Sequence, residues 1–279
     1  MSDEVAAFVP GHITGFFSAH PADEPTKAGS RGAGLTLSDG VEVTVRPAST
    51  TRIALNGSPI EMEPVERVLG ALGVDARVSA ETDLPLGAGF GVSGAMSLGT
   101  ALAANAAFGC GHSENELTTV AHGAEVQAGT GLGDVVAQAR GGLPIRLEPG
   151  APGYGLLDGI PARARIEYVT FGDLPTEEVL SGDTKRLSTA GQHALSRLVA
   201  EPTLPRLMSA SRRFAREAGL LTDEVAAAVR DVSEAGGEAS MAMLGRTAFA
   251  LGTGLSDAGY DATACRTHPT GAALLGDEV

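Results

Sequence analysis

The sequence is short of lysine, cysteine and tryptophan, and each shortage narrows the class of protein. Lys27 and Lys185 are the only lysines, Cys110 and Cys265 are the only cysteines, and there is no tryptophan. Without a CxxC pair, the cysteines predict no zinc site and favour a reduced, intracellular chain. The N-terminal stretch MSDEVAAFVPGH has no basic segment followed by an apolar one. No signal peptide is therefore expected, and the predicted location is the cytoplasm.

Long apolar runs and an excess of positive charge are missing as well. No apolar stretch reaches the roughly 20 residues that a membrane-spanning helix needs. The chain has 20 Lys and Arg against 34 Asp and Glu, a formal net charge of −14. This balance disfavours binding to nucleic acid or to an anionic membrane, because both carry negative charge. The scarcity of lysine favours adaptation to high salt, and an ordinary acidic enzyme is the alternative.

The N-terminal half alternates between strand and helix patterns. The pattern predicts a strand at 41–46, a helix that begins at Pro64 and stops at Gly73, and a strand at 74–80. The predicted elements that follow are a close-packed helix at 93–108, a helix at about 114–128 opened by a capping box of Ser113 and Glu116, and a helix, a Gly-Gly turn and a strand within 135–149.

The pattern changes from about residue 160 onward. IEYVTF (166–171) reads as a strand, and several amphipathic helices are expected through residue 252. The alternating stretches at 261–268 and 271–275 predict a final hairpin. At 279 residues, the chain is expected to form two α+β lobes, 1–155 and 156–279, although no linker composition marks the boundary. The oligomeric state is left open, with a homodimer among the alternatives.

A glycine-rich loop, PLGAGFGVSGA at 85–95, precedes the helix predicted at 93–108. Glycines let backbone N–H groups approach an anion, and a helix N-terminus adds about half a positive charge, so the loop suits a phosphate. No GxxxxGK[ST] motif is present, which excludes a Walker-type P-loop. No acidic residue stands where a dinucleotide fingerprint needs one. A tight turn that only packs the helix is the alternative.

This loop resembles the nucleotide-binding loop of the GHMP kinases, which usually reads PxGxGLGSSA. Phe90 stands in place of the leucine, Val92 replaces the first serine and Gly94 replaces an alanine. Ser93 therefore matches the second serine, with Ser97 as a weaker substitute. The residues that the resemblance implies for ATP binding are Pro85, Gly87, Gly89, Gly91, Ser93 and Gly94.

The stretch HGAEVQAGTGLGD (122–134) resembles the polar machinery of the same kinases. Glu125 matches their magnesium-binding glutamate, and Asp134 matches the aspartate that faces the hydroxyl to be phosphorylated. The resemblance implies that Ser93 and Glu125 hold Mg²⁺ and that Ser93, Glu125 and Asp134 form the catalytic set. Mg²⁺ prefers hard oxygen ligands, and phosphoryl transfer needs alignment and charge neutralisation. For Glu125 alone, a solvated helix charge is the alternative.

The same resemblance implies an α+β fold of two lobes, the first like domain 2 of ribosomal protein S5 and the second ferredoxin-like. Among GHMP kinases, the chain is most similar to the archaeal pantoate kinases, through VPGHITGFF, GSRGAG and LPTEEVL. Those enzymes phosphorylate the 4-hydroxyl of pantoate on the route to coenzyme A. The stretch 240–250 keeps only Gly245 of the third glycine-rich motif, as pantoate kinases do. The resemblance implies that the substrate-binding residues are Ser30, His122, Arg146 and Thr176.

Several of these residues have a structural alternative. Thr176 is also a candidate helix N-cap, Arg146 a surface residue of a strand, and His122 a buried histidine with satisfied nitrogens. His12, in PGHITG, is a further substrate-site candidate that could instead brace the first strand. At the level of function, the alternatives are another GHMP kinase of the mevalonate or homoserine type and a nucleotide-binding sensor without catalysis. Retention of the whole catalytic set argues against the sensor.

Overall fold

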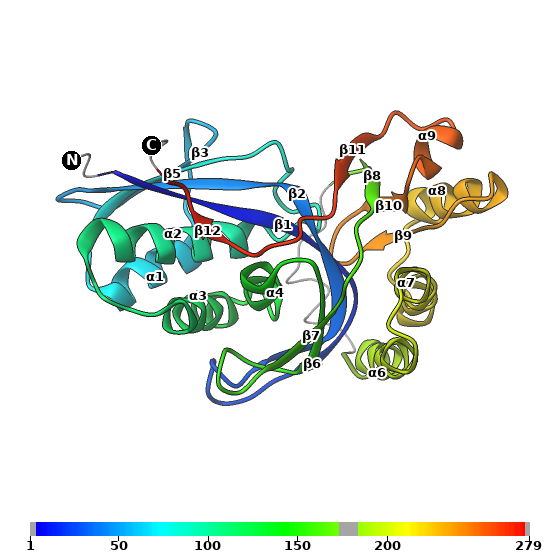
Figure 1. Cartoon of the computed structure of the whole chain (residues 1–279), viewed down its shortest axis with the longest axis horizontal. Coiled ribbons are helices and arrows are strands. Elements are labelled where there is room, and N and C mark those ends of the chain that lie inside the picture. The colour runs from blue at the N-terminus through cyan, green and yellow to red at the C-terminus, as the bar shows by residue number, and fades with distance from the viewer. Residues whose placement is uncertain (1–3, 173–183, 277–279) are drawn as a thin grey trace.

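The computed structural model describes residues 4–172 and 184–276, which form two β-sheets flanked by helices (Figure 1). The strands are β1 (Val5–His20), β2 (Gly29–Pro47), β3 (Arg52–Leu55), β4 (Ser58–Pro59), β5 (Ala76–Glu81), β6 (Leu143–Glu148), β7 (Leu156–Ile160), β8 (Arg165–Thr170), β9 (Ala239–Ala242), β10 (Thr247–Leu251), β11 (Thr263–Arg266) and β12 (Ala273–Leu274). The helices are α1 (Glu63–Leu72), α2 (Val92–Phe108), α3 (Glu114–Ala128), α4 (Asp134–Arg140), α6 (Thr184–Ala200), α7 (Leu204–Ala218), α8 (Asp223–Glu234) and α9 (Gly254–Asp257).

The first sheet is built on a long antiparallel hairpin of β1 and β2. Its strand order is β12-β1-β2-β5-β3-β4, with β6 paired to β2 and β7 paired to β6. The helices α1 to α4 cover one face of this sheet (Figure 1). The β1–β2 pairing shifts register between Pro10 and His12 and again between Thr14 and Phe16. Such irregularities bend a strand and re-aim its side chains, and here they lie where β1 passes the cavity described below.

The helices of the first lobe begin and end within one residue of the predicted positions. Pro64 lies in the first turn of α1, and Gly73 ends that helix in the left-handed conformation. Ser113 and Glu116 form the reciprocal capping box of α3. The helix α2 is composed mostly of small, buried residues and packs closely on β1 and β2. Local signals therefore suffice for the bounds of these three helices, because Pro64, the capping box and the glycines that end each helix act within one turn of a helix end.

The second sheet has the order β11-β8-β10-β9 and is accompanied by α6 to α9. Two expectations for this part of the chain are wrong. Residues 239–242 and 247–251 are the paired strands β9 and β10 and not helices. The predicted final hairpin does not form either, because β11 pairs with β8 in the second sheet while β12 pairs with β1 in the first.

The two errors have different physical causes. Every residue of β9 and nearly every residue of β10 is buried, so these strands show no alternation of polar and apolar residues from which a period could be read. The choice of partner for β11 and β12 depends on strands that lie far away in the sequence. The division of the chain at residue 155 stays a prediction.

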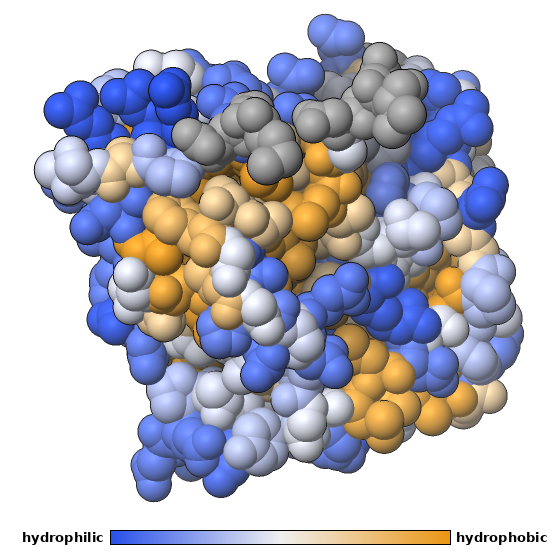
Figure 2. Space-filling view, turned by 60° about the vertical axis from the view of Figure 1, so that its left-hand side comes forward, coloured by the Kyte–Doolittle hydropathy of each residue, from blue (hydrophilic) through white to orange (hydrophobic). Residues whose placement is uncertain are grey.

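The described surface is mixed in character. Figure 2 shows patches of apolar side chains bordered by charged and polar areas on one face. The large apolar side chains most exposed among the described residues are Leu86, Tyr154, Leu156, Val199, Leu274 and Leu275. None of the helices in the described ranges combines the length and the apolar character that crossing a membrane requires.

Candidate active site

A cavity of about 350 Å³ lies where the glycine-rich loop meets the N-terminus of α2. Its walls come from several parts of the chain that are distant in the sequence. The loop contributes residues 86–94 except Ala88, the turn after α3 contributes 128–134, and the second lobe contributes Met243 and Leu244. The β1–β2 hairpin and β6 add Thr14, Phe17, Ser30 and Arg146, and Met62 and Glu125 complete the wall. Most of the residues singled out in the sequence therefore surround one space.

The loop owes its shape to glycines in the left-handed region. Gly87, Gly89 and Gly91 have φ of 77°, 90° and 65°, values that residues with a Cβ adopt only with strain. Gly91 is the N-cap of α2, so the positive end of a 17-residue helix faces the cavity. This geometry suits an anion. Of the predicted ATP-binding residues, only Pro85 is not part of the cavity wall.

The second lobe closes one side of the loop. Thr247 donates a hydrogen bond from Oγ1 to the carbonyl of Ala88 at 2.8 Å. The Met243 N–H donates to the Thr14 carbonyl at 2.9 Å. The turn between β9 and β10 is thereby anchored to both the loop and β1. The sequence contained no signal for this contact beyond the isolated Gly245.

Glu125 is the centre of a buried cluster of hydroxyl groups. Its Oε1 accepts hydrogen bonds from Ser93 at 2.7 Å and Ser97 at 2.8 Å, and its Oε2 accepts one from Thr130 at 2.9 Å. Burial raises the pKa of this carboxyl, although the three hydroxyl donors act in the opposite direction. Glu125 is only 2% exposed, which excludes the alternative of a solvated helix charge. Thr130, in the GTGLGD turn, was missed at the sequence level.

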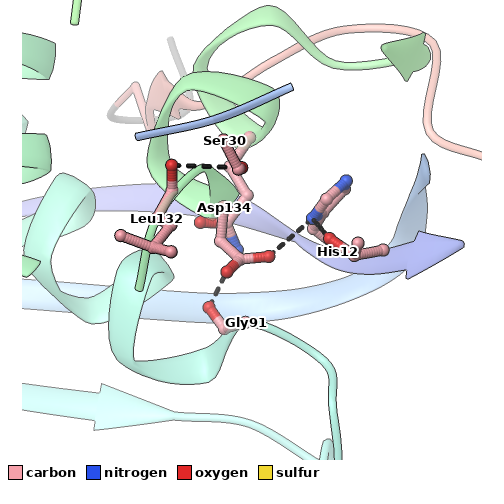
Figure 3. Close-up of polar contacts among 7 residues, drawn as sticks. His12, Ser30, Gly91, Leu132 and Asp134 are labelled. Atoms are coloured by element: carbon pink, nitrogen blue, oxygen red, sulfur yellow. Dashed lines mark hydrogen bonds and ion pairs between the residues drawn. The ribbon is translucent and has the colours of Figure 1, made fainter. Parts of the chain in front are cut away.

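Asp134 is the first residue of α4, and it faces His12 from β1. His12 Nδ1 lies 2.7 Å from Asp134 Oδ1 (Figure 3). Burial by itself would raise the pKa of Asp134, but the hydrogen bond and electrostatic interaction with His12 and the positive charge of Arg146 outweigh it, so that the pKa lies below its usual value. The Asp134 side chain is 27% exposed, which leaves it open toward the cavity.

Arg146 is a buried cation without a hydrogen-bonding partner for most of its head group. The residue is 2% exposed, and its Nε and Nη1 have no acceptor among the described residues. Burial lowers the pKa of this guanidinium, and the charge of Asp134 opposes that effect. Arg146 is therefore not the surface strand residue of the alternative interpretation. A buried donor without an acceptor is costly, which is the condition expected of a group that awaits an anionic ligand.

The remaining predicted substrate residues differ in position. Ser30 lies in the cavity wall, where its hydroxyl donates to the Leu132 carbonyl at 3.2 Å (Figure 3). His122 is buried outside that wall, with Nε2 2.8 Å from the carbonyl of Ala28. Burial is the main cause of its lowered pKa. A role of His122 toward substrate stays a prediction, and Thr176 lies outside the described residues.

The chain is similar in sequence to proteins of a known family. Residues 62–142 match the GHMP kinases N terminal domain. The chain is 38% identical over 264 residues to the pantoate kinase of Thermococcus kodakarensis, covering 88% of this chain and 87% of that protein. It is 37% identical over 257 residues to the pantoate kinase of Methanospirillum hungatei, covering 89% of this chain and 87% of that protein.

Solved structures show the same similarity. One described as a phosphotransferase related to the CoA biosynthesis pathway has a TM-score of 0.87 and 32% identity, covering 97% of this chain and 98% of the other. The mevalonate diphosphate decarboxylase of Enterococcus faecalis has a TM-score of 0.75 at 16% identity, with 98% of this chain and 99% of the other covered. The latter shares the fold alone.

Proposed function

The chain belongs to the pantoate kinase family of the GHMP kinases, and on that premise we propose that it transfers the γ-phosphoryl group of ATP to the 4-hydroxyl of pantoate on the route to coenzyme A. The products are ADP, 4-phosphopantoate and a proton. The family also confirms the expected α+β fold. The observation that carries the proposal is one cavity with an anion-binding loop at one side and a buried, unpartnered guanidinium at another.

Arg146 and Ser30 supply the contacts that a small hydroxy acid needs. A carboxylate can accept two parallel hydrogen bonds from a guanidinium, and such charge-assisted pairs are strong when water is excluded. The Nε and Nη1 of Arg146 have no acceptor among the described residues, and because these N–H groups leave different sides of the guanidinium, each can donate a single hydrogen bond to an anionic ligand. Phe17 and Leu132 also line the cavity, and they provide an apolar wall for the gem-dimethyl group of pantoate. These features support a carboxylate-bearing acceptor over a purely neutral one.

Ser93 and Glu125 would hold Mg²⁺ at the opposite side. The residues fit such an ion, because a buried carboxylate surrounded by hydroxyl oxygens is a donor set that hard cations prefer. Burial raises the pKa of Glu125. A cation bound beside this carboxylate would stabilise the charged form that burial disfavours. When bound, Mg²⁺ would neutralise charge on the ATP phosphates. The glycine-rich loop would bind those phosphates through its backbone N–H groups.

Asp134 would orient the acceptor hydroxyl. Its lowered pKa keeps the carboxylate ionised at neutral pH, so it can accept a hydrogen bond from the 4-hydroxyl. A carboxylate of low basicity is a sufficient acceptor here, because the transition state of phosphoryl transfer is loose and the nucleophile keeps its proton until late. Asp134 therefore works mainly by positioning, with the proton taken up as the new bond forms.

The test is a panel of acceptors with ATP and Mg²⁺: pantoate, mevalonate, homoserine and pantothenate. ADP should form with pantoate and not with the other three. Asp134→Asn is the matched control, because it keeps shape and hydrogen bonding but loses charge. Its kcat should fall by roughly 10²-fold or more, the usual scale for a positioned acid–base group, with ATP affinity retained. An acceptor that is phosphorylated better than pantoate would contradict the proposed substrate. A near-normal kcat in Asp134→Asn would contradict the proposed role of Asp134.

A further inference from the structure

The hydrogen bond between His12 and Asp134 joins two residues that are 122 positions apart in the sequence. From this contact we infer that His12 is a positioning residue, a neutral hydrogen-bond donor that fixes the Asp134 carboxylate toward the acceptor and does not relay the proton. The inference rests on the proposed function for the identity of the acceptor. It concerns a residue that the phosphoryl-transfer roles assigned above leave unused.

The surroundings of His12 decide which of its nitrogens carries hydrogen. The side chain is fully buried. Its Nε2 has no hydrogen-bonding partner among the described residues. That nitrogen lies against the backbone of Gly34, where a Cβ would come within 2.5 Å of it. A hydrogen on Nε2 would be a buried donor without an acceptor, whereas a hydrogen on Nδ1 donates to the Asp134 carboxylate. The Nδ1–H tautomer is therefore favoured.

A proton relay would need His12 to become an imidazolium, and the same surroundings oppose that. Both nitrogens of an imidazolium are donors, so the second N–H would again point at Gly34 without an acceptor. Burial is also the largest influence on the pKa of His12 and lowers it, and the charge of Arg146 acts in the same direction. The adjacent Asp134 opposes these effects without reversing them. His12 thus stays a dipole, not a proton carrier.

The backbone holds this histidine in place from two sides. The His12 N–H donates to the Phe90 carbonyl at 2.9 Å, which ties it to the glycine-rich loop. The two register shifts in the β1–β2 pairing lie immediately before and after the segment from His12 to Thr14. The Asp134 carboxylate that accepts this histidine's Nδ1–H is the group assigned above to orient the acceptor hydroxyl. His12 therefore connects the phosphate-binding loop with the orientation of the acceptor.

The experiment compares His12→Asn with His12→Leu. Asparagine places an N–H donor at the same number of bonds from Cα as Nδ1, and leucine has the same branching without a donor. We expect His12→Leu to lower kcat by roughly 10- to 100-fold, because small displacements of a reacting group have effects of this size. Its KM for ATP should stay within about twofold of the wild-type value, and His12→Asn should recover most of kcat. His20→Asn, on the same strand but outside the cavity wall, is the control and should behave as wild type.

Three outcomes would overturn the inference. An unchanged kcat in His12→Leu would remove His12 from the reaction. Equal losses in His12→Asn and His12→Leu, with both variants folded, would mean that an imidazole is required and would favour a relay. A parallel loss of melting temperature, kcat and both KM values in His12→Leu would make the residue a structural brace.

A second readout does not depend on the substrate. Nitrogen-15 NMR of the imidazole groups in the unliganded protein should show His12 protonated on Nδ1 alone at neutral pH. An Nε2–H tautomer or an imidazolium would overturn the inference. If the wild-type chain fails to phosphorylate pantoate, the proposed function fails. The NMR result, and the same kinetic comparison with whichever acceptor proves active, still decide the role of His12.

Discussion

Gly245, in the turn between β9 and β10, lies against Ala88 of the glycine-rich loop so closely that a Cβ at position 245 would come within 2.0 Å of the Ala88 carbonyl oxygen. The neighbouring Thr247 hydroxyl donates to that same oxygen. The one glycine kept in stretch 240–250 is therefore the residue at which the second lobe reaches the loop. Contact between the lobes at this point depends on the absence of a side chain.

Gly245→Ala should displace the loop from the second lobe. A Cβ there meets backbone atoms, which yield less readily than a flexible side chain, and overpacking of this kind typically costs about 1–3 kcal/mol of stability. We expect the KM for ATP to rise more than the KM for pantoate. Steady-state kinetics with each substrate varied, together with thermal melting, measures both effects.

Gly70→Ala is the matched control for that variant. Nothing lies within 4 Å of a Cβ at this position in α1, and alanine is favoured over glycine inside a helix by about 0.8–1.0 kcal/mol. Its kinetics should be unchanged and its melting temperature slightly raised. A Gly245→Ala protein with wild-type kinetics and stability would show that the contact between turn and loop is dispensable.

Glu125→Gln should separate activity from stability. The amide can keep hydrogen bonds with Ser93 and Ser97, but it is a poorer ligand for Mg²⁺ than a carboxylate. We expect lower turnover and a higher Mg²⁺ requirement in a magnesium titration. Because burial raises the pKa of Glu125, the charged form is disfavoured in the fold, and the wild type loses stability as pH rises from 4.5 through the folded pKa.

The glutamine variant lacks that loss. At neutral pH its melting temperature should therefore equal or exceed that of the wild type when no Mg²⁺ is added. Ser93→Ala should shift the magnesium dependence in the same direction but more mildly, because water can replace one hydroxyl. A wild-type rate and Mg²⁺ dependence in Glu125→Gln would remove Glu125 from the metal site.

Arg146→Ala should weaken pantoate binding specifically. Loss of one partner of a buried charged pair costs on the order of 2–5 kcal/mol, which should appear as a raised KM for pantoate with little change in the KM for ATP. An acceptor that carries a neutral amide in place of the pantoate carboxylate provides the contrast. It should bind wild type poorly, and Arg146→Ala should weaken it much less.

A variant that keeps the fold distinguishes a loss of pantoate binding from a loss of stability. Arg146→Met keeps most of the side-chain volume, and replacement of a buried charge by an apolar group is often neutral or stabilising. We expect its melting temperature to be at least that of the wild type while the pantoate KM rises as in Arg146→Ala. Equal increases in both KM values would instead indicate a phosphate role or a folding defect.

His122→Gln should reduce the loss of stability in mild acid. Burial lowers the pKa of His122, with Arg146 acting in the same direction and the Ala28 carbonyl opposing it. Below about pH 6.5 the unfolded chain therefore takes up a proton that the folded chain does not. The free energy of unfolding falls as pH decreases through this range, by at most about 1.4 kcal/mol per pH unit for one such residue.

Glutamine can keep the hydrogen bond to Ala28 because its Nε2 lies at the same number of bonds from Cα, but it does not titrate. Urea denaturation between about pH 5.5 and 7.5 measures the slope. The slope should be smaller in the variant. His12 and His20, whose pKa values are also lowered, add to the slope in both proteins, and Glu125, whose pKa is raised, acts in the opposite direction in both. An unchanged slope would show that His122 does not titrate between the two states in this range.

Elements whose form depends on contacts within a few residues were predicted from the sequence, and strands whose pairing depends on distant residues were not. The helix α1 with Pro64 and Gly73, and α3 with its capping box, follow from contacts within a few residues, and the expected bounds hold to within one residue. By contrast, β9 and β10 were expected to be helical and the last two strands to pair with each other. Burial on both faces hides the period of a strand, and strand partners are chosen by distant parts of the chain.

The candidate site likewise contains residues that the sequence predicted and contacts that it did not. The sequence alone predicts the order of the chemical groups, from the glycine-rich loop through Ser93, Glu125 and Asp134 to Arg146, because each belongs to a motif that resembles a known family. It contained no local signal that His12 would meet Asp134, that Thr130 would bond to Glu125 or that Met243 would line the cavity. The bond from Thr130 spans five residues at the end of α3. The other two contacts depend on tertiary structure, because the path of β1 brings His12 to Asp134 and the approach of the second sheet to the glycine-rich loop brings Met243 to the cavity.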